Sequence, residues 1–238
     1  MKKNKLLLHK QILAAVLSGG MLLLPNWGYA LPQGGQVVAG TGSIGAPGGD
    51  QMNITGSGNV AIDWNSFNVA QGESVKFSGM QAVLNYVTGN TKSEIFGNIS
   101  GSGVHVFLVN PNGILFGATA SVNVGELTAS TRTIDNRKSF DGTAFSILSP
   151  EAAQKVRGDI INLGELTADK ILLEGDNISL LNAHMLKSSG NGNITLRADN
   201  KVTVGYEVTD KTTINVGDDA PGGHTAVSYT HLTLPTIC

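Results

Sequence analysis

The sequence predicts an all-β fold in which short strands stack into a solenoid, and three observations support it. Glycine contributes 31 of the 238 residues and asparagine 20, whereas only 14% of the residues are charged. This composition argues against a helical bundle or a coiled coil, and a hydrophobic content of 41% argues against a wholly disordered chain. The other two observations are short runs of alternating apolar residues and an internal repeat.

The repeat indicates how the strands are arranged. Asn123–Ala129 recurs as Asn162–Ala168, an offset of 39 residues. Shorter strand-like runs begin with asparagine and a β-branched residue, as in Asn59–Ile62, Asn177–Leu180 and Asn193–Leu196. A β-sandwich is the alternative, but its turns recur about every 8–12 residues and need no sequence repetition. We therefore expect a solenoid with about 20 residues per coil, so that the offset equals two coils.

Stacking has consequences that a structure can check. Leu127 and Leu166 should occupy the same inward position two coils apart, about 9–10 Å along the axis. Glu126 and Glu165 occupy equivalent positions in the repeat, which suggests a stacked or solvated face rather than a site. Asparagines at coil corners should tolerate the left-handed region and bond to the asparagine of the next coil.

Two segments depart from the repeat. Ser149–Gly158 reads as a short helix, with Ser149 as N-cap, Pro150 at the first helical position and Gly158 at the end. Together with the charged stretch Arg132–Asp141, we expect it to form an exposed excursion from a coil. Residues 218–238 share nothing with the repeats, and we expect a disordered, truncated or non-native tail.

The first thirty residues read as a signal peptide. Met1–Lys10 is basic, Ile12–Leu24 is largely apolar, and Gly28 and Ala30 are the small residues that precede a cleavage site. The sequence predicts cleavage after Ala30, so that the mature chain begins at Leu31 outside the cytoplasm. A short membrane anchor is the alternative, but the apolar stretch falls short of the about 20 residues that span a bilayer.

Composition excludes several kinds of site in the rest of the chain. Beyond residue 30 there are 12 basic and 18 acidic side chains, so no electrostatic attraction to nucleic acid is expected. The single cysteine, Cys238, allows neither an intrachain disulfide nor a thiolate metal site. The five histidines form no metal motif, and we expect His105 to be an outward-facing side chain. No cofactor or metal is predicted.

A polysaccharide-active β-helix enzyme is the main alternative class of protein. Such enzymes need clustered carboxylates with a basic partner. The candidates are Asp159, Asp169, Asp176 and Asp199, but each lies beside Gly, Asn or Lys, in a setting where aspartate commonly forms turns. We therefore predict that the protein is not an enzyme.

The most distinctive segment is Val104–Gly117, which reads as strand, turn and strand, with Asn110–Gly113 as the turn. Similar blocks precede it at Trp64–Val69, Gly72–Phe77, Ala82–Gly89 and Ile95–Ile99. In this order, the blocks resemble the amino-terminal secretion domain, or haemagglutination activity domain, of two-partner-secretion exoproteins, the filamentous-haemagglutinin-like adhesin family. The resemblance covers residues 31–135 and continues weakly to about 217. The Asn-Pro-Asn-Leu motif that some members carry upstream is absent.

This resemblance implies a right-handed single-stranded parallel β-helix with an N-terminal cap. The expected divisions are a signal peptide (1–30), the secretion domain (31–150), continuing β-helix repeats (151–217) and the tail (218–238). It also implies passage through the periplasm to the cell surface or medium, by way of an outer-membrane transporter with POTRA domains. The residues it marks for transporter recognition are Asn85, Asn110, Pro111, Asn112, Gly113 and Ile114.

Family members are far longer than this chain, so we expect a fragment whose downstream region is missing. An adhesin is the expected role, with the missing region contacting a host-cell surface or glycan. A contact-dependent toxin carrier is the alternative within the family, and the missing region would decide between the two.

Overall fold

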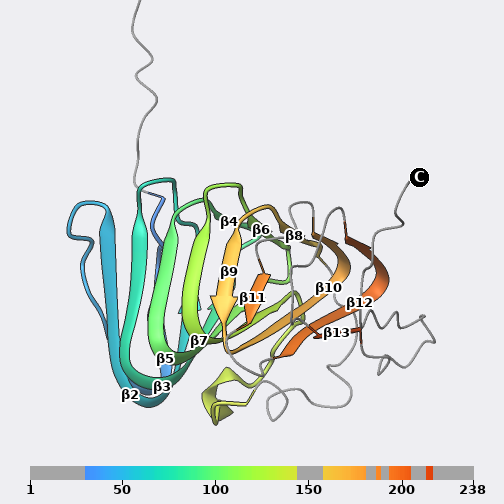
Figure 1. Cartoon of the computed structure of the whole chain (residues 1–238). Coiled ribbons are helices and arrows are strands. Elements are labelled where there is room, and N and C mark those ends of the chain that lie inside the picture. The colour runs from blue at the N-terminus through green and yellow to red at the C-terminus, as the bar shows by residue number, and fades with distance from the viewer. Residues whose placement is uncertain (1–29, 144–157, 181–185, 189–192, 205–212, 217–238) are drawn as a thin grey trace, which may run out of the picture.

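The computed structural model describes residues 30–143, 158–180, 186–188, 193–204 and 213–216. These ranges form a parallel β-solenoid of about five turns with almost no helix, which confirms the predicted fold class (Figure 1). The described strands are β1 (Gln36–Ile44), β2 (Gln51–Trp64), β3 (Ser74–Val87), β4 (Ser93–Ile95), β5 (Asn98–Val109), β6 (Ile114–Phe116), β7 (Ser121–Ser130), β8 (Ile160–Asn162), β9 (Glu165–Ala168), β10 (Lys170–Leu180), β11 (Leu186–Ser188), β12 (Asn193–Val204) and β13 (Thr213–Val216). A single 3₁₀ turn in these ranges, η1, spans Arg137–Ser139.

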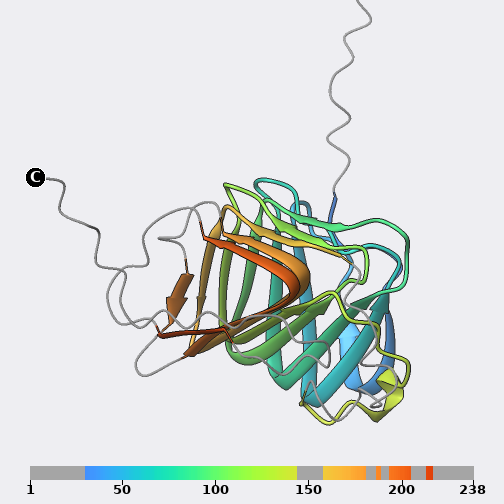
Figure 2. The same cartoon turned by 90° about the vertical axis from the view of Figure 1, so that its right-hand side faces the viewer.

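Each coil contributes to three sheet faces, and successive coils follow the same bent path in Figure 2. The first face contains the beginnings of β2, β3, β5 and β7, followed by β9 and β11. The second face contains the ends of β2, β3, β5 and β7, followed by the beginnings of β10 and β12 and by β13. The third face contains β4, β6, β8 and the ends of β10 and β12.

The coil length is close to the expected value, but the expected register is wrong. Val60, Val83 and Val106 stack on one another, so a coil has 23 residues here. Leu127 then stacks on Ile171, 44 residues later, because residues 132–157 separate the end of β7 from the next described part of the solenoid. Leu166 instead stacks on Val122, on the first face.

The 39-residue repeat therefore does not equal two coils. Leu127 and Leu166 both point inward, with 2% and 0% of their surface exposed, but they lie on different faces of neighbouring coils. Glu126 pairs in register with Lys170 and Glu165 with Ser121, so the two glutamates do not share a stack. The offset misleads because it includes the 26 residues of 132–157.

The interior of the solenoid is a continuous apolar column. Alternate residues of each strand point into it, as the period-two pattern predicts, and stack on one another along the axis, as Val60, Val83 and Val106 do. The largest fully buried side chains of this column include Trp64, Phe67, Phe77 and Phe116. Each contributes about 1.5–3 kcal/mol or more through burial, so packing stabilises the coils without any disulfide.

Glycines form the corner between the first and second faces. Gly58, Gly79 and Gly103 lie there in successive coils with φ angles of 60°, 79° and 70°. Residues other than glycine rarely adopt backbone conformations with such positive φ angles. The pairing register shifts at the same points, so these glycines let one long strand bend from one face to the next.

The amino-terminal end is closed by the expected cap. Strand β1 pairs antiparallel with β2, from Gln36 opposite Asp63 to Ile44 opposite Ile54. Leu31, just before it, is fully buried. Among the described residues, we find no helix of the length and apolar character needed to cross a bilayer.

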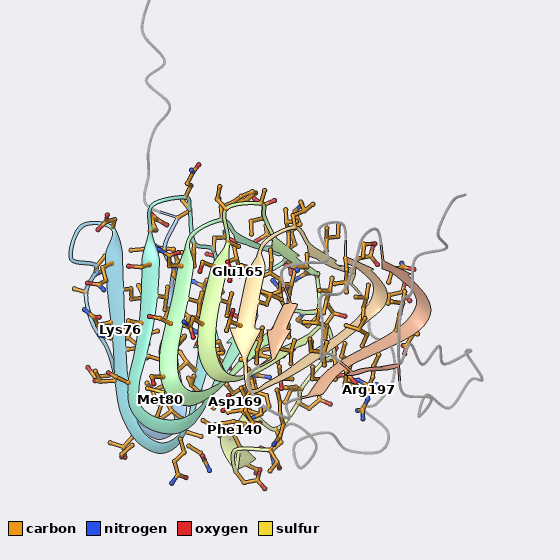
Figure 3. The ribbon with its side chains drawn as sticks, viewed as in Figure 1. Lys76, Met80, Phe140, Glu165, Asp169 and Arg197 are labelled. Carbon is orange, nitrogen blue, oxygen red and sulfur yellow. The ribbon has the colours of Figure 1, made fainter. Side chains whose placement is uncertain are left out.

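The excursion after β7 packs against the molecule rather than being exposed, so that expectation is wrong for its first part. Ile134 and Phe140 have only 4% and 8% of their surface exposed. They cover outward-facing apolar residues of the second face, including Leu84 and Phe107. Phe140 lies between the η1 segment and the strands in Figure 3, with its ring edge-on to that of Phe107 at 5.3 Å. The predicted helix Ser149–Gly158 lies outside the described residues except for Gly158.

The predicted ladder of asparagines between coils is also wrong in the described ranges. Asn59 faces Ala82, Asn98 faces Ser121 and Asn177 faces Lys201. Asn162 instead exchanges side-chain hydrogen bonds with the main chain of Gly164 in its own turn.

Candidate functional site

Five of the six predicted recognition residues, Asn110–Ile114, lie at the corner between the second and third faces. Four passes of the chain stack there, and we call them the corner stack: 64–65, 88–92, 110–113 and 158–159. The Thr88 N–H donates to Trp64 O at 2.8 Å, the Ser93 N–H to Gly113 O at 3.0 Å and the Ile114 N–H to Asp159 O at 3.0 Å. The turn Asn110–Gly113 therefore sits between an earlier loop and the point where the excursion returns.

Asn110 is the buried anchor of this turn. None of its surface is exposed, and its Nδ2 donates to Thr91 O at 2.9 Å and to Ser93 Oγ at 3.0 Å. Its Oδ1 accepts from the Asn112 N–H at 2.9 Å, which is the local turn bond expected of asparagine. One side chain therefore joins two coils and fixes the turn.

The rest of the turn faces outward. Asn112 is exposed, and its Nδ2 donates to Gly89 O at 2.8 Å and to Asn110 Oδ1 at 3.0 Å. Pro111 is half-buried. Gly113 has a φ of 113°, and a Cβ there would lie 3.0 Å from Asp159 O. The turn therefore requires glycine at this position for both its conformation and its packing.

Asn85, the predicted partner from the earlier block, lies inside the column. It is fully buried, its Oδ1 accepts from Trp64 Nε1 at 3.1 Å, and its Nδ2 donates to Phe107 O at 3.2 Å. These bonds satisfy the buried indole and amide together. Asn85 therefore connects three coils from within and does not reach the surface.

The structure brings the two sequence blocks 82–89 and 110–114 together, but only part of them is accessible. Asn85, Asn110 and Ile114 have at most 2% of their surface exposed. The exposed residues of the corner stack are Asn65, Thr88, Asn90, Thr91, Lys92, Asn112 and Asp159. In the folded domain, a partner can touch this outer set, whereas the buried set shapes it.

The neck of the excursion lies on the same corner. The Thr131 hydroxyl donates to Gly158 O at 2.9 Å, joining the point where the chain leaves to the point where it returns. Next to it, Arg132 Nε lies 2.7 Å from Glu174 Oε1, without the alignment of a hydrogen bond, and Ser130 Oγ donates to Glu174 Oε2 at 2.9 Å. Glu174 is only 4% exposed, so this pair neutralises a buried carboxylate.

A second set of contacts fastens the excursion to the cap end, and sequence reasoning missed it. Arg137 donates to both carboxylate oxygens of Asp63, at 2.6 and 3.0 Å, and lies 4.3 Å from the centre of the Tyr86 ring. Burial raises the pKa of the Tyr86 phenol, although Arg137 opposes the shift. The sequence feature that could have indicated these contacts is the pair of apolar residues Ile134 and Phe140, which flank Arg137 in an otherwise charged stretch.

His105 points outward, as expected, into a groove on the second face. Its ring stacks on Phe107 at 3.9 Å, its Nε2 lies 2.9 Å from Thr128 Oγ1 and its Nδ1 lies 3.4 Å from Glu126. Burial lowers the pKa of the imidazole, while Glu126 opposes this. The groove has a volume of about 460 Å³ and is bounded partly by Gly142 of the excursion.

The four candidate aspartates do not form one site. Asp159 accepts from Asn177 at 2.8 Å, and Asp169 lies in the turn at the opposite end of β9 from Glu165 (Figure 3). Asp176 and Asp199 lie within β10 and β12, where the register shifts, rather than in separate turns as expected. Within the described ranges, no three His, Cys, Asp or Glu side chains are grouped to hold a metal ion.

Comparison with known proteins identifies this architecture. The model of the family described as "TPS secretion domain" matches residues 30–232. The chain belongs to this family. The resemblance inferred from the Asn110–Ile114 turn and its neighbouring blocks is therefore confirmed, and members are secretion domains of two-partner-secretion exoproteins.

Relatives of this TPS secretion domain are known in sequence and in structure. It is 30% identical over 173 residues to a heme/hemopexin-binding protein of Haemophilus influenzae strain Rd, covering 70% of this chain and 19% of that protein. A second Haemophilus influenzae heme/hemopexin-binding protein is 36% identical over 108 residues, covering 44% of this chain and 12% of that protein. The chain thus spans about a fifth or less of these relatives.

The crystal structure of the HMW1 secretion domain from Haemophilus influenzae shares the fold. It is 28% identical in sequence, with a TM-score of 0.51, covering 72% of this chain and 57% of that chain.

Proposed function

We propose that this domain is the export signal of a longer exoprotein, and that a partner outer-membrane transporter recognises its corner stack. The observation that carries the proposal is that two separate blocks, 82–89 and 110–114, form one outward-facing corner joined by the hydrogen bond from Asn112 to Gly89. Buried residues that hold a small set of exposed polar side chains in a fixed geometry are expected at a binding surface.

Within the proposal the predicted residues divide into two roles. Asn85, Asn110, Gly113 and Ile114 position the corner, because they are buried. Asn112 and Pro111, with the 88–92 loop, offer the surface that the transporter's periplasmic POTRA domains contact. The export route of the protein begins with the signal peptide, which is cleaved after Ala30, and ends outside the cell.

The experiment compares secretion with stability for matched variants in a host carrying the cognate transporter. We expect Asn112→Ala to reduce secretion at least tenfold while lowering the urea midpoint only slightly, since this side chain is exposed. Asn123→Ala, at an exposed position of β7 away from the corner, is the control and should be secreted normally. Normal secretion of a folded Asn112→Ala protein would remove the recognition role and leave a structural turn.

The downstream region, absent from this chain, is proposed to be an adhesin that binds host cells or their glycans. The named relatives support a passenger that binds a ligand at the surface, because two of them are heme/hemopexin-binding proteins. Binding of haem or hemopexin by the intact protein is thus a second candidate. Adding hemin to the full-length protein and to this domain, and comparing absorption spectra, separates a passenger function from one in the domain. A toxin carrier or a polysaccharide-active enzyme has no such support.

A further inference from the structure

Glu73 is a buried carboxylate that the export proposal does not use. It follows the turn before β3 and is 5% exposed. Its Oε1 accepts from the main-chain N–H of Ala30 at 2.8 Å, and its Oε2 accepts from the N–H of Ala70 at 2.7 Å. The salt bridges within the described ranges include none to Glu73. Two neutral amides therefore hold a carboxylate that has been removed from water.

The buried carboxylate of Glu73 lacks a compensating positive charge among the described residues. A buried carboxylate is costly unless a positive charge or several strong donors compensate for its lost hydration. One of its two donors, Ala30, is the last residue before the predicted cleavage. The chain therefore loses that donor when the signal peptide is removed.

Cleavage also creates the missing charge at nearly the same place. Hydrolysis of the Ala30–Leu31 peptide bond turns the Leu31 nitrogen into an α-ammonium group, within one residue of the Ala30 nitrogen, or about 3.8 Å between successive Cα atoms. Leu31 is fully buried. Its carbonyl accepts from Gln33 Nε2 at 2.7 Å, and the Gln33 N–H donates to Ser66 O at 2.9 Å. The new terminus therefore forms one residue from the nitrogen that Glu73 already binds.

We propose that Glu73 is the binding site for the α-ammonium group that signal cleavage creates at Leu31. The proposal rests on cleavage after Ala30. In the precursor the carboxylate accepts from two neutral amides, whereas in the mature chain it accepts from an ammonium group, so that both ends of the hydrogen bond carry charge and the two charges are opposite. Removal of the leader then strengthens the cap that closes the first coil.

A double-mutant cycle tests this pairing in purified protein. Residues 31–238 and residues 28–238 are each released from a fusion partner, with glutamate or glutamine at position 73. The longer chain keeps the neutral Ala30 amide. We expect removal of residues 28–30 to raise the folding equilibrium constant at least tenfold more with Glu73 than with Glu73→Gln. An equal effect in both backgrounds overturns the proposal. Glu94→Gln, which alters an exposed ion pair with Lys92, is the control and should leave the difference intact.

A second measurement serves if Glu73→Gln does not fold. The pKa of the Leu31 α-amine is followed by NMR in residues 31–238 labelled with ¹³C-leucine. Pairing with Glu73 places it above the ordinary range of about 7.7–8.0, whereas burial without a negative partner places it below. A lowered value contradicts the proposal.

Different measurements would show that the export proposal fails. Amino-terminal sequencing of the secreted protein checks whether it begins at Leu31, and the secretion assay checks recognition. Both purified chains still report whether Glu73 prefers an α-ammonium group, whatever those assays show.

Discussion

The corner stack contains a tight turn and a long excursion one coil apart, and comparing them shows what a coil requires. At residues 110–113 the chain turns in four residues around the buried Asn110. One coil later it leaves at Thr131 and returns at Gly158, and the coil closes with one hydroxyl-to-carbonyl bond. The backbone pairing is continuous across both, since the Asn110 N–H donates to Ser130 O and the Thr131 N–H to Glu174 O. A single anchored polar side chain, rather than a fixed turn length, therefore defines the corner.

Replacing the anchor of the tight turn should have the largest effect. Asn110→Ala removes both donors to the 91–93 segment and the acceptor for the Asn112 N–H, leaving buried polar groups unsatisfied. We expect a loss of about 2–3 kcal/mol in the free energy of unfolding, measured by urea denaturation. Asn112→Ala, in the same turn but exposed, should cost less than about 1 kcal/mol. Equal losses for the two would contradict the division into anchor and surface.

Detaching the excursion should have the next largest effect. Arg137→Met keeps an aliphatic side chain but removes both the paired hydrogen bonds to Asp63 and the guanidinium over the Tyr86 ring, and we expect a loss of about 1–2 kcal/mol. Asp63→Asn should cost less, and the two changes together should cost less than their sum, because they share one interaction. Additive losses would mean that Ile134 and Phe140 hold the excursion by themselves.

The neck itself can be tested with a nearly isosteric change. Thr131→Val removes the donor to the Gly158 carbonyl without opening a cavity, and we expect a loss of about 1 kcal/mol. Hydrogen exchange should then increase at the ends of β7 and β8 and stay unchanged at β2 and β3. Increased exchange throughout the solenoid would show that the neck is not a local clasp.

The smallest expected effect depends on pH. Burial lowers the pKa of His105 below the ordinary 6.5, so the unfolded chain binds its proton more readily than the folded chain. The contribution of His105 is therefore complete above about pH 6.5 and is lost as the pH falls through the lowered folded value. The urea midpoint at pH 5.5 should fall further below its value at pH 7.5 for the wild type than for His105→Gln. The same fall in both proteins would assign the pH dependence to other groups.

The sequence predicted what depends on local periodicity. The alternation in runs such as Asn193–Leu196 gave the strands, and the block pattern around Asn110 gave the family and the fold. The register across coils was not predictable in this way, because the distance from Leu127 to its stacking partner includes a segment that leaves the solenoid. The local pattern indicated that Arg132–Asp141 and Ser149–Gly158 leave a coil, but it did not indicate how many residues have to be left out when the register is counted.

The site was predicted only in part, for a related reason. Asn110 and Asn112 have the same residue type in one motif, yet one is fully buried and the other exposed. Their difference depends on loop 88–92 of the preceding coil, which covers Asn110. The charged stretch Arg132–Asp141 looked solvated, but its apolar residues find the outward-facing Leu84 and Phe107, and that surface exists only after three coils have stacked.

The hydrogen bond between Thr131 and Gly158 also makes this corner an insertion site for protein engineering. Thr131 and Gly158 meet within one hydrogen bond, so a peptide or domain whose own termini lie close together can be inserted after Thr143 while Ile134, Arg137 and Phe140 keep their contacts with the coils. The entropy of closing such a loop grows only slowly with its length, by about 0.6 kcal/mol for each doubling. A fluorescent reporter or a vaccine epitope inserted there would be displayed beside the corner stack, at a fixed position along the solenoid axis.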